Sequence, residues 1–219
     1  MTRAEEIAAN VASVRERIAR AAVRAGRDPA GVLLVAVTKT KPLEDARAAY
    51  AAGIRAFGEN RVQEAEEKFP LLPADAERHL IGPIQSNKAN RAARIAAVVQ
   101  TVDSADIARR LARGAETAGK QLRVFLEIRL GGEATKAGVD PREAAGLADE
   151  VRKLPALELA GLMTIPPPGD TRTHFKTLRR LASELGLAEL SMGMSDDFEA
   201  AVEEGATAVR IGTALFGSR

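Results

Sequence analysis

The sequence predicts an α/β protein: a single (β/α)8 barrel of the TIM type, with an extra helix at its N-terminus, that spans residues 1–219 as one domain. Three observations predict this fold. Eight short apolar segments alternate with longer segments of helical spacing, which is typical of βα units in a parallel sheet. No linker, low-complexity stretch or change of composition divides the chain, and its 219 residues suit a one-domain barrel.

The elements are expected in alternating order along the chain. An amphipathic, charged segment predicts the extra helix at 3–25. Strands are expected at 32–37, 54–57, 79–81, 97–101, 122–130, 157–162, 187–190 and 206–211. Helices are expected between them at 42–52, 60–69, 86–95, 104–118, 140–153, 171–185 and 196–204. An open flavodoxin-like or Rossmann-like sheet is the alternative, although no GxGxxG follows the first strand.

The composition excludes several classes of function. There is no cysteine and there are 2 histidines, so disulfides, thiolate nucleophiles and a transition-metal site are not expected. The formal charge is +2 with acids and bases interleaved, and aromatic residues make up 3%, so nucleic acid is not an expected partner. The N-terminus lacks a leader pattern and no apolar stretch is long enough for a membrane span, so we expect a cytoplasmic protein.

Lys39 is the first candidate for chemistry because it follows the apolar segment 32–37, where a buried strand should end. It shares parity with Val35 and Val37, so its amine is expected to point into the barrel. A lysine nucleophile must lose its proton, and only burial or cationic neighbours lower its pKa from about 10.4. A solvated lysine on the rim is the alternative. Lys41, directly before Pro42, is expected in solvent.

Two late loops carry residues suited to an anion. Barrel active sites form at the C-terminal strand ends, and phosphate commonly binds the loops after strands 7 and 8. After the seventh strand, Gly193 permits a close backbone approach and Ser195 offers a hydroxyl. After the eighth, Gly212 and Thr213 offer backbone N–H groups and a hydroxyl. The alternatives are that Ser195 is only a helix cap and Gly212 only a turn glycine.

Three further polar residues are expected at or near the same end. Arg210 has the opposite parity to Val209 and Ile211, so its guanidinium should point inward and need an acceptor; a structural ion pair or a rim arginine is the alternative. Asn60 follows the second strand, and His79 lies on the third, where a hydrogen-bonded core histidine is the alternative. An inward amine facing a phosphate site suggests a phosphorylated aldehyde or ketone. Pyridoxal 5′-phosphate (PLP) fits, as does an aldolase substrate.

Six segments, in order along nearly the whole chain, make the sequence similar to a known family. They are TKTKP at 38–42, FGENRVQE at 57–64, HLIGPIQSNK at 79–88, EATKAGV at 133–139, GLMTIP at 161–166 and SMGMSDDFEAAVEEGATAVRIGTALFG at 191–217. On these segments the chain resembles the pyridoxal phosphate homeostasis proteins, which are related to the N-terminal barrel domain of alanine racemase. The set is specific, although each segment alone is not.

The resemblance implies a fold-type III PLP protein in which Lys39 forms a Schiff base with PLP. It also implies phosphate contacts from Ser195, Gly212 and Thr213, a contact from Arg210 toward the pyridine nitrogen, and Asn60 and His79 near the ring. The chain departs from the family pattern at Arg78, Ala92 and Arg129, where an aromatic residue, an aliphatic residue and an asparagine are expected. The departure at Arg129 puts one polar contact to the ring in doubt.

A binding function is expected over catalysis. A racemase needs acid/base groups on both faces of the ring, and in the similar racemases one is a tyrosine from a separate domain. The only tyrosine here, Tyr50, falls in the helix after the first strand, and an arginine at the pyridine nitrogen weakens the ring as an electron sink. We therefore expect a monomeric PLP-binding protein of vitamin B6 homeostasis, with PLP-dependent apoenzymes as partners. A low-activity PLP-dependent racemase and a cofactor-free Schiff-base aldolase are the alternatives.

Overall fold

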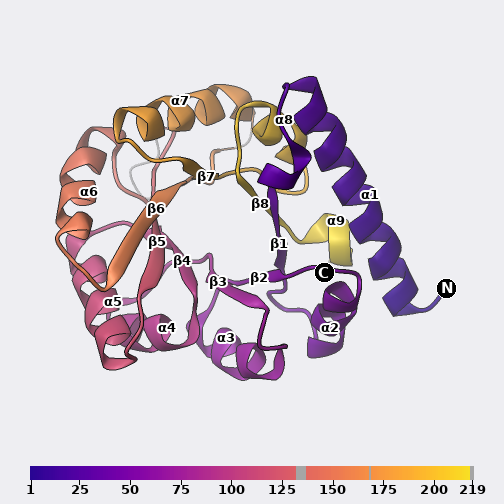
Figure 1. Ribbon diagram of the computed structural model, residues 1–219, viewed down its shortest axis with the longest axis horizontal. Coiled ribbons are helices and arrows are strands. Elements are labelled where there is room, and N and C mark those ends of the chain that lie inside the picture. The colour runs from indigo at the N-terminus through magenta and orange to yellow at the C-terminus, as the bar shows by residue number, and fades with distance from the viewer. Residues whose placement is uncertain (132–136, 168, 218–219) are drawn as a thin grey trace.

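The strands close into a barrel, as the sequence predicts. The computed structural model describes residues 1–131, 137–167 and 169–217, and in it eight parallel strands pair in sequence order, with β8 pairing back to β1 (Figure 1). The strands are β1 Leu33–Val37, β2 Ala56–Glu59, β3 Glu77–Leu80, β4 Val98–Val102, β5 Leu122–Glu127, β6 Leu157–Met163, β7 Glu189–Ser191 and β8 Ala208–Ile211. Of the segment 133–139 that carries part of the family resemblance, residues 133–136 lie outside the described residues.

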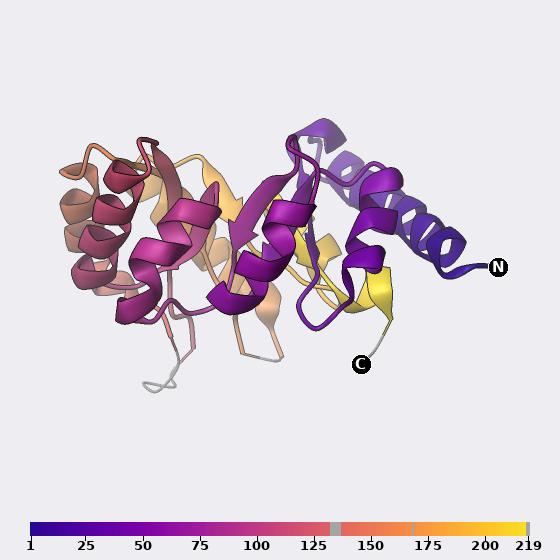
Figure 2. The same cartoon turned by 90° about the horizontal axis from the view of Figure 1, so that it is seen from below.

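The helices form a ring around the strands. Between or after the strands lie α2 Leu43–Ala51, α3 Val62–Lys68, α4 Ala89–Ile95, α5 Ala105–Thr117, α6 Ala144–Arg152, α7 Thr171–Glu184, α8 Phe198–Glu203 and α9 Thr213–Phe216. Short 3-10 turns occur at Pro29–Gly31, Phe69–Leu71, Ser86–Lys88 and Pro141–Glu143. The extra helix α1 Arg3–Arg24 lies outside the ring, against α2, α8 and α9 (Figures 1 and 2). No described helix combines the length and apolar character that a membrane span requires.

Local chemistry starts α1 and fixes it to the barrel. The Thr2 hydroxyl accepts from the Glu5 N–H at 3.3 Å and the Glu5 carboxylate accepts from the Thr2 N–H at 2.7 Å, which is a capping box. Arg3 donates to the Asp45 carboxylate of α2 and to the Phe216 carbonyl of α9, both at 2.7 Å. One face of the helix is buried against the barrel: Ile7, Val11, Val14 and Ile18.

Several strands are displaced from their expected positions. The seventh begins at Glu189 and the eighth at Ala208, each two residues later than expected, and the fifth ends at Glu127 and not at 130. The second begins at Ala56 and not at 54, because the Ile54 N–H bonds the Ala49 carbonyl at the end of α2 at 3.0 Å, although Ile54 is buried. The third begins at Glu77 and not at 79, and the Glu77 N–H bonds the Arg55 carbonyl at 2.7 Å. Its first residues are charged, so an apolar pattern does not mark its start.

The barrel interior is partly apolar and partly polar. The main core lies between strands and helices, whereas an inner cluster consists of Val98, Phe125 and Met163 with Ala160 packed against it. Polar residues are also buried inside, among them His79, Gln100, Ser191 and Arg210. We call the end where the strands begin the N-terminal mouth, and the end where they finish, with the following loops, the C-terminal mouth.

Candidate functional site

A cavity of about 210 Å³ at the C-terminal mouth brings together six of the seven predicted site residues. These are Lys39, Asn60, Ser195, Arg210, Gly212 and Thr213. They come from the ends of β1, β2, β7 and β8, far apart in sequence, which is how barrel enzymes and binding proteins assemble sites. Apolar side chains of Val37, Ile81, Ile165 and Met194 complete much of the lining.

Lys39 lies in a tight turn between β1 and α2. Its side chain is half-buried and lines the cavity, as its parity with Val37 predicts. The next residue, Thr40, has φ +61°, a left-handed conformation that is rare for a β-branched residue. The Thr40 N–H donates to the Glu64 carboxylate at 2.6 Å. This bond helps to hold the backbone in its strained form.

A partly buried ion cluster under the turn, which we call the Lys68 cluster, consists of Lys68, Glu59 and Glu64. The Lys68 ammonium donates to the Thr38 carbonyl at 2.7 Å, to Glu59 at 3.0 Å and to Glu64 at 2.6 Å. The Thr38 hydroxyl donates to Glu59 at 2.7 Å. Burial raises the pKa of Glu59, and the bonds from Thr38 and Lys68 act against that shift. The cluster therefore anchors the residue before Lys39, and sequence reasoning did not find it.

The second lysine of the turn has a different role. Lys41 donates to the Phe216 and Gly217 carbonyls at 3.3 and 3.2 Å, at the end of α9. The expectation that Lys41 is simply solvated is therefore wrong, because these carbonyls follow the last helical turn and attract a cation. Lys39 lines the cavity, whereas Lys41 holds the C-terminal segment against the turn.

The two late loops meet, as expected, through Ser195. Its hydroxyl accepts from the Ala214 N–H of α9 at 3.2 Å. The alternative that Ser195 caps the helix after it is wrong, because α8 begins at Phe198 with Asp197 at its N-cap. Gly193 has φ +93°, and a Cβ there would lie 2.5 Å from the Ala201 Cβ, so this position requires glycine.

Gly212 and Thr213 lie where the short helix α9 begins. Gly212 is its N-cap and Thr213 its first residue, so the first backbone N–H groups of the helix lie beside the cavity. A Cβ on Gly212 would meet Val37 only at ordinary contact distances. Gly212 is therefore placed at the site without being required there by close packing.

Arg210 is buried, and two of its guanidinium nitrogens donate hydrogen bonds within the barrel. Its side chain points into the barrel, as its parity predicts, and the residue is 3% exposed. One guanidinium nitrogen donates to the Ser191 hydroxyl at 2.7 Å and another to the Thr164 carbonyl at 2.9 Å. Burial lowers the pKa of Arg210 to about 10, and the charges of Glu127 and Asp197 oppose the shift. Arg210 therefore remains a cation at neutral pH and lies at the inner end of the cavity.

Glu127, at the end of β5, is a second charge that sequence reasoning missed. It is 6% exposed, and its Oε2 has no hydrogen-bond partner among the described residues. Burial raises its pKa to about 7, with a further increase from Asp103 and a decrease from Arg210. The signal that could have found it is a carboxylate at the end of an otherwise apolar strand.

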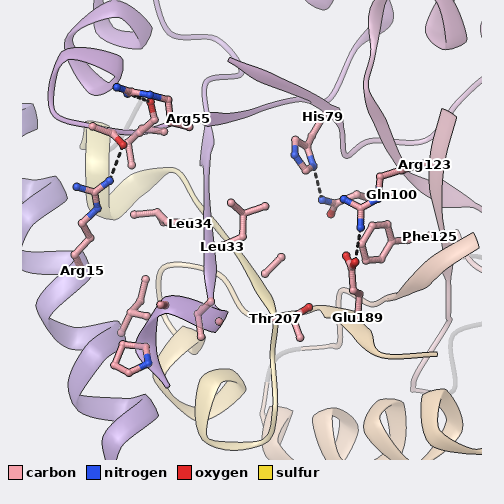
Figure 3. Close-up of a pocket in the computed structure, with 18 residues that line it drawn as sticks. Arg15, Leu33, Leu34, Arg55, His79, Gln100, Arg123, Phe125, Glu189 and Thr207 are labelled. Carbon is pink, nitrogen blue, oxygen red and sulfur yellow. Dashed lines mark hydrogen bonds and ion pairs between the residues drawn. The ribbon is translucent and has the colours of Figure 1, made fainter. Parts of the chain in front are cut away.

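His79 lies deeper in the barrel than the other predicted site residues. It is 2% exposed, and it lines a separate cavity of about 750 Å³ at the N-terminal mouth. Its Nε2 contacts the Glu77 carboxylate and its Nδ1 contacts the Gln100 amide nitrogen, each at 2.9 Å. Figure 3 shows the contact with Gln100 inside this mouth. His79 is therefore not beside Lys39. It is connected to Arg210 by hydrogen bonds through Gln100 and Ser191.

The N-terminal mouth also carries an exposed ion cluster. The Arg123 guanidinium contacts Glu189 (Figure 3). It also lies 3.8 Å from Glu77 and 3.5 Å from Glu158. These side chains are each between a third and a half exposed. Water therefore screens the pairs. Among the described residues there is no group of acidic or histidine side chains that could hold a metal ion.

The C-terminal mouth fits a phosphorylated aldehyde in its donor set. An amine can form a Schiff base, the late loops offer N–H and hydroxyl donors, and Arg210 supplies a buried cation. Tyr50 is remote from this mouth: its hydroxyl donates to Asp75 at 2.6 Å on the outside of the barrel. Arg129, which departs from the family pattern, donates to the Gly138 carbonyl at 2.9 Å.

Comparison with known proteins gives one family. A sequence model for "Alanine racemase, N-terminal domain" matches residues 5–219. A pyridoxal phosphate homeostasis protein from Pseudomonas aeruginosa is 50% identical, over 97% of this chain and 96% of that protein. One from Escherichia coli K12 is 41% identical, over 98% of this chain and 97% of that protein.

Solved structures agree with the barrel described above. PipY of Synechococcus elongatus with PLP bound is 40% identical and superposes with a TM-score of 0.85, covering 96% of this chain and 100% of that one. An alanine racemase from Clostridium difficile superposes with a TM-score of 0.77 at 17% identity, covering 98% of this chain and 57% of that one. The second likeness concerns the fold alone.

Proposed function

The chain belongs to the family of alanine racemase N-terminal domains, and from that premise we propose that it is a PLP-binding protein of intracellular vitamin B6 homeostasis. Its relatives at 50% and 41% identity bear the name pyridoxal phosphate homeostasis protein. In this proposal the whole chain acts as one PLP-binding barrel domain, which holds PLP as a Schiff base on Lys39 without efficient catalysis.

One observation carries the proposal. The Lys39 amine, the buried Arg210 guanidinium and the two late loops share a single cavity of about 210 Å³. In the proposed complex, Ser195, Gly212 and Thr213 bind the phosphate, because their hydroxyls and N–H groups lie at the start of α9. Asn60 lies beside the ring, and Arg210 faces the pyridine nitrogen.

The same residues argue for holding over turnover. When bound, PLP supplies an aldehyde for an amine and a ring that can accept electrons if its nitrogen is protonated. Arg210 is a cation with donors only, so it offers no proton acceptor that would favour a protonated ring nitrogen. Tyr50 bonds Asp75 outside the barrel and cannot serve as the opposing acid or base. His79 acts on the cavity only through other residues.

The proposal extends to the setting of the protein. The whole set of proposed ligands comes from one chain, so a monomer is sufficient. The cavity opens at a mouth with exposed Ile165 and Met194, which is compatible with release of PLP to PLP-dependent apoenzymes in the cytoplasm.

The test is a visible spectrum with chemical trapping. We expect the protein loaded with PLP to show the absorption band of a Schiff base, and borohydride to fix the adduct on Lys39. Modification blocks cleavage after Lys39, so the adduct should appear on the tryptic peptide 28–47. Lys39→Ala should lose both band and adduct, whereas Lys41→Ala should keep both.

Three outcomes would contradict the proposal. An unchanged band and adduct in Lys39→Ala, with Lys41 unmodified, would move the site elsewhere. Sustained racemisation of alanine that is abolished in Lys39→Ala would establish a racemase. No band with PLP, with trapping only on addition of an aldol substrate, would establish a cofactor-free aldolase.

A further inference from the structure

A chain of hydrogen bonds crosses the barrel interior from one mouth to the other. Arg210 donates to the Ser191 hydroxyl at 2.7 Å, and that hydroxyl donates to the Gln100 carbonyl oxygen at 2.7 Å. The Gln100 amide nitrogen lies 2.9 Å from the His79 Nδ1, and the His79 Nε2 lies 2.9 Å from the Glu77 carboxylate. The four contacts join four strands, β8, β7, β4 and β3, to one another.

The donors in this chain all point the same way. An amide nitrogen is only a donor, so the His79 Nδ1 facing it must be an acceptor and carry no proton. A neutral imidazole then has its proton on Nε2, where it donates to Glu77. The Gln100 oxygen is left to accept from Ser191, and the Ser191 oxygen is left to accept from Arg210. Every link is satisfied with His79 neutral.

A second proton on His79 would break this order. Nδ1–H would then need an acceptor, so the Gln100 amide would have to reverse and present its oxygen to His79. Its nitrogen would then face Ser191, and the Ser191 hydroxyl would receive two donors and lose its acceptor. A buried donor without an acceptor is unfavourable, and Ser191 is fully buried. The order of donors and acceptors along these hydrogen bonds therefore depends on whether His79 carries a second proton.

We propose that His79, Gln100 and Ser191 are positioning residues: a neutral, Nε2-protonated His79 fixes the direction of the chain, and the chain sets the guanidinium of Arg210 at the cofactor cavity. The proposal rests on the proposed PLP-binding function. It makes the Glu77 carboxylate, at the N-terminal mouth, relevant to a ligand bound at the other mouth. The charges that meet there are those of Glu77, Arg123, Glu158 and Glu189.

The first test needs no cofactor. The chain has 2 histidines, so His174→Asn leaves His79 as the single imidazole. With nitrogen-15 in histidine, two-bond proton–nitrogen NMR spectra report which ring nitrogens carry protons. We expect a bare Nδ1 and a protonated Nε2 at neutral pH, with and without PLP. A proton on Nδ1 would overturn the proposal even if PLP binds as expected.

The second test measures the effect on PLP. In Gln100→Glu the carboxylate accepts from both neighbours, so His79 should gain its second proton in the NMR spectrum. Ser191→Ala removes the acceptor of one Arg210 nitrogen, so we expect PLP to bind about fivefold more weakly, which corresponds to one hydrogen bond, and its visible band to titrate at a different pH. In a Ser191→Ala background Gln100→Glu should have no further effect on binding or band, because the hydrogen bonds no longer reach Arg210.

Controls separate a positioning role from a general loss of structure. Leu33 lines the same N-terminal cavity but takes no part in the chain of hydrogen bonds. Leu33→Ala should therefore leave the PLP affinity and the visible band unchanged. A PLP affinity and visible band in Ser191→Ala equal to those of the wild type would overturn the proposal. If PLP does not bind to the wild-type protein, the proposed function fails, while the NMR result on His79 still stands or falls separately.

Discussion

The two mouths of the barrel differ in size and in chemistry, and the smaller one has the more constrained residues. The N-terminal mouth has the larger cavity, about 750 Å³ against about 210 Å³. Its main cation, Arg123, is already surrounded by three carboxylates that water screens. The C-terminal mouth has a half-buried lysine, a strained Thr40 and a Glu127 oxygen that finds no hydrogen-bond partner in the described part of the chain. Backbone strain and buried charged groups therefore identify the candidate site better than cavity volume does.

Burial explains why the same residue types behave differently at the two ends. A screened ion pair contributes about 0–1 kcal/mol, whereas breaking a buried pair by removing one partner costs about 3–5 kcal/mol. Glu59 in the Lys68 cluster is fully buried, while Arg123 is about a third exposed. Substitutions at the C-terminal mouth should therefore have larger effects on stability.

The largest effect is expected for Lys68→Met. It removes the cation from a site with two carboxylates and should lower the free energy of unfolding by about 4 kcal/mol. It also frees the Thr38 carbonyl, so trapping of PLP on Lys39 should weaken. Urea denaturation and borohydride trapping measure the two effects. Lys153→Met, on the surface beside Glu150, is the control and should match the wild type. Equal midpoints for the two variants would refute the anchoring role of the Lys68 cluster.

A smaller, pH-dependent effect is expected for Glu127→Gln. The pKa of Glu127 is about 7 in the folded protein against an ordinary 4.5, so the folded state binds more protons between these values. Wild-type stability should therefore fall as pH rises through this window, by up to about 3 kcal/mol. The variant is neutral throughout and should lack this fall.

Urea denaturation of the PLP-free protein between pH 5 and pH 8 measures the Glu127 effect. The difference between Glu127→Gln and the wild type should be small at pH 5 and should grow until it levels off above pH 7. Glu184→Gln, on the exposed end of α7, should show no such pH-dependent difference. A constant difference across this range would mean that Glu127 is ionised in the fold.

The smallest effect is expected for Arg123→Met at the N-terminal mouth. Its ion pairs are half-exposed, so the loss should be about 1 kcal/mol or less. PLP binding should be unchanged, because Arg123 is not part of the chain that reaches Arg210. Fluorescence titration with PLP and urea denaturation in 0.1 and 1 M salt check this. A loss as large as that of Lys68→Met would remove the contrast between the mouths.

Much of the fold could be predicted because each strand of a buried parallel sheet is an apolar segment. The same logic found Lys39 and Arg210, since parity along a strand decides which side chains point inward. It failed where the first residues of a strand are charged, as at Glu77 and Arg78. Those residues pair with other strands at the N-terminal mouth, and an apolar pattern does not describe them.

The depth of a residue in the barrel could not be predicted from parity. His79 points inward, and the stagger of the strands places it level with Gly58 and Val98, below the cofactor cavity. Gln100 and Glu127 were missed because their strands read as apolar. A polar residue inside an apolar strand is the signal that the sequence offers, and its partners depend on strand register.

Thr40 has one further consequence. Among the described residues it is the only one other than glycine with a left-handed backbone, at a cost of about 1–3 kcal/mol. Contacts within the protein, from Glu64 to the Thr40 N–H and from Lys68 to the Thr38 carbonyl, hold it there. The turn is therefore preorganised, and capture of an aldehyde by Lys39 requires little ordering of the backbone. Association should be limited by how often ligand and cavity meet, and selectivity by how well the remainder of the ligand fits the cavity.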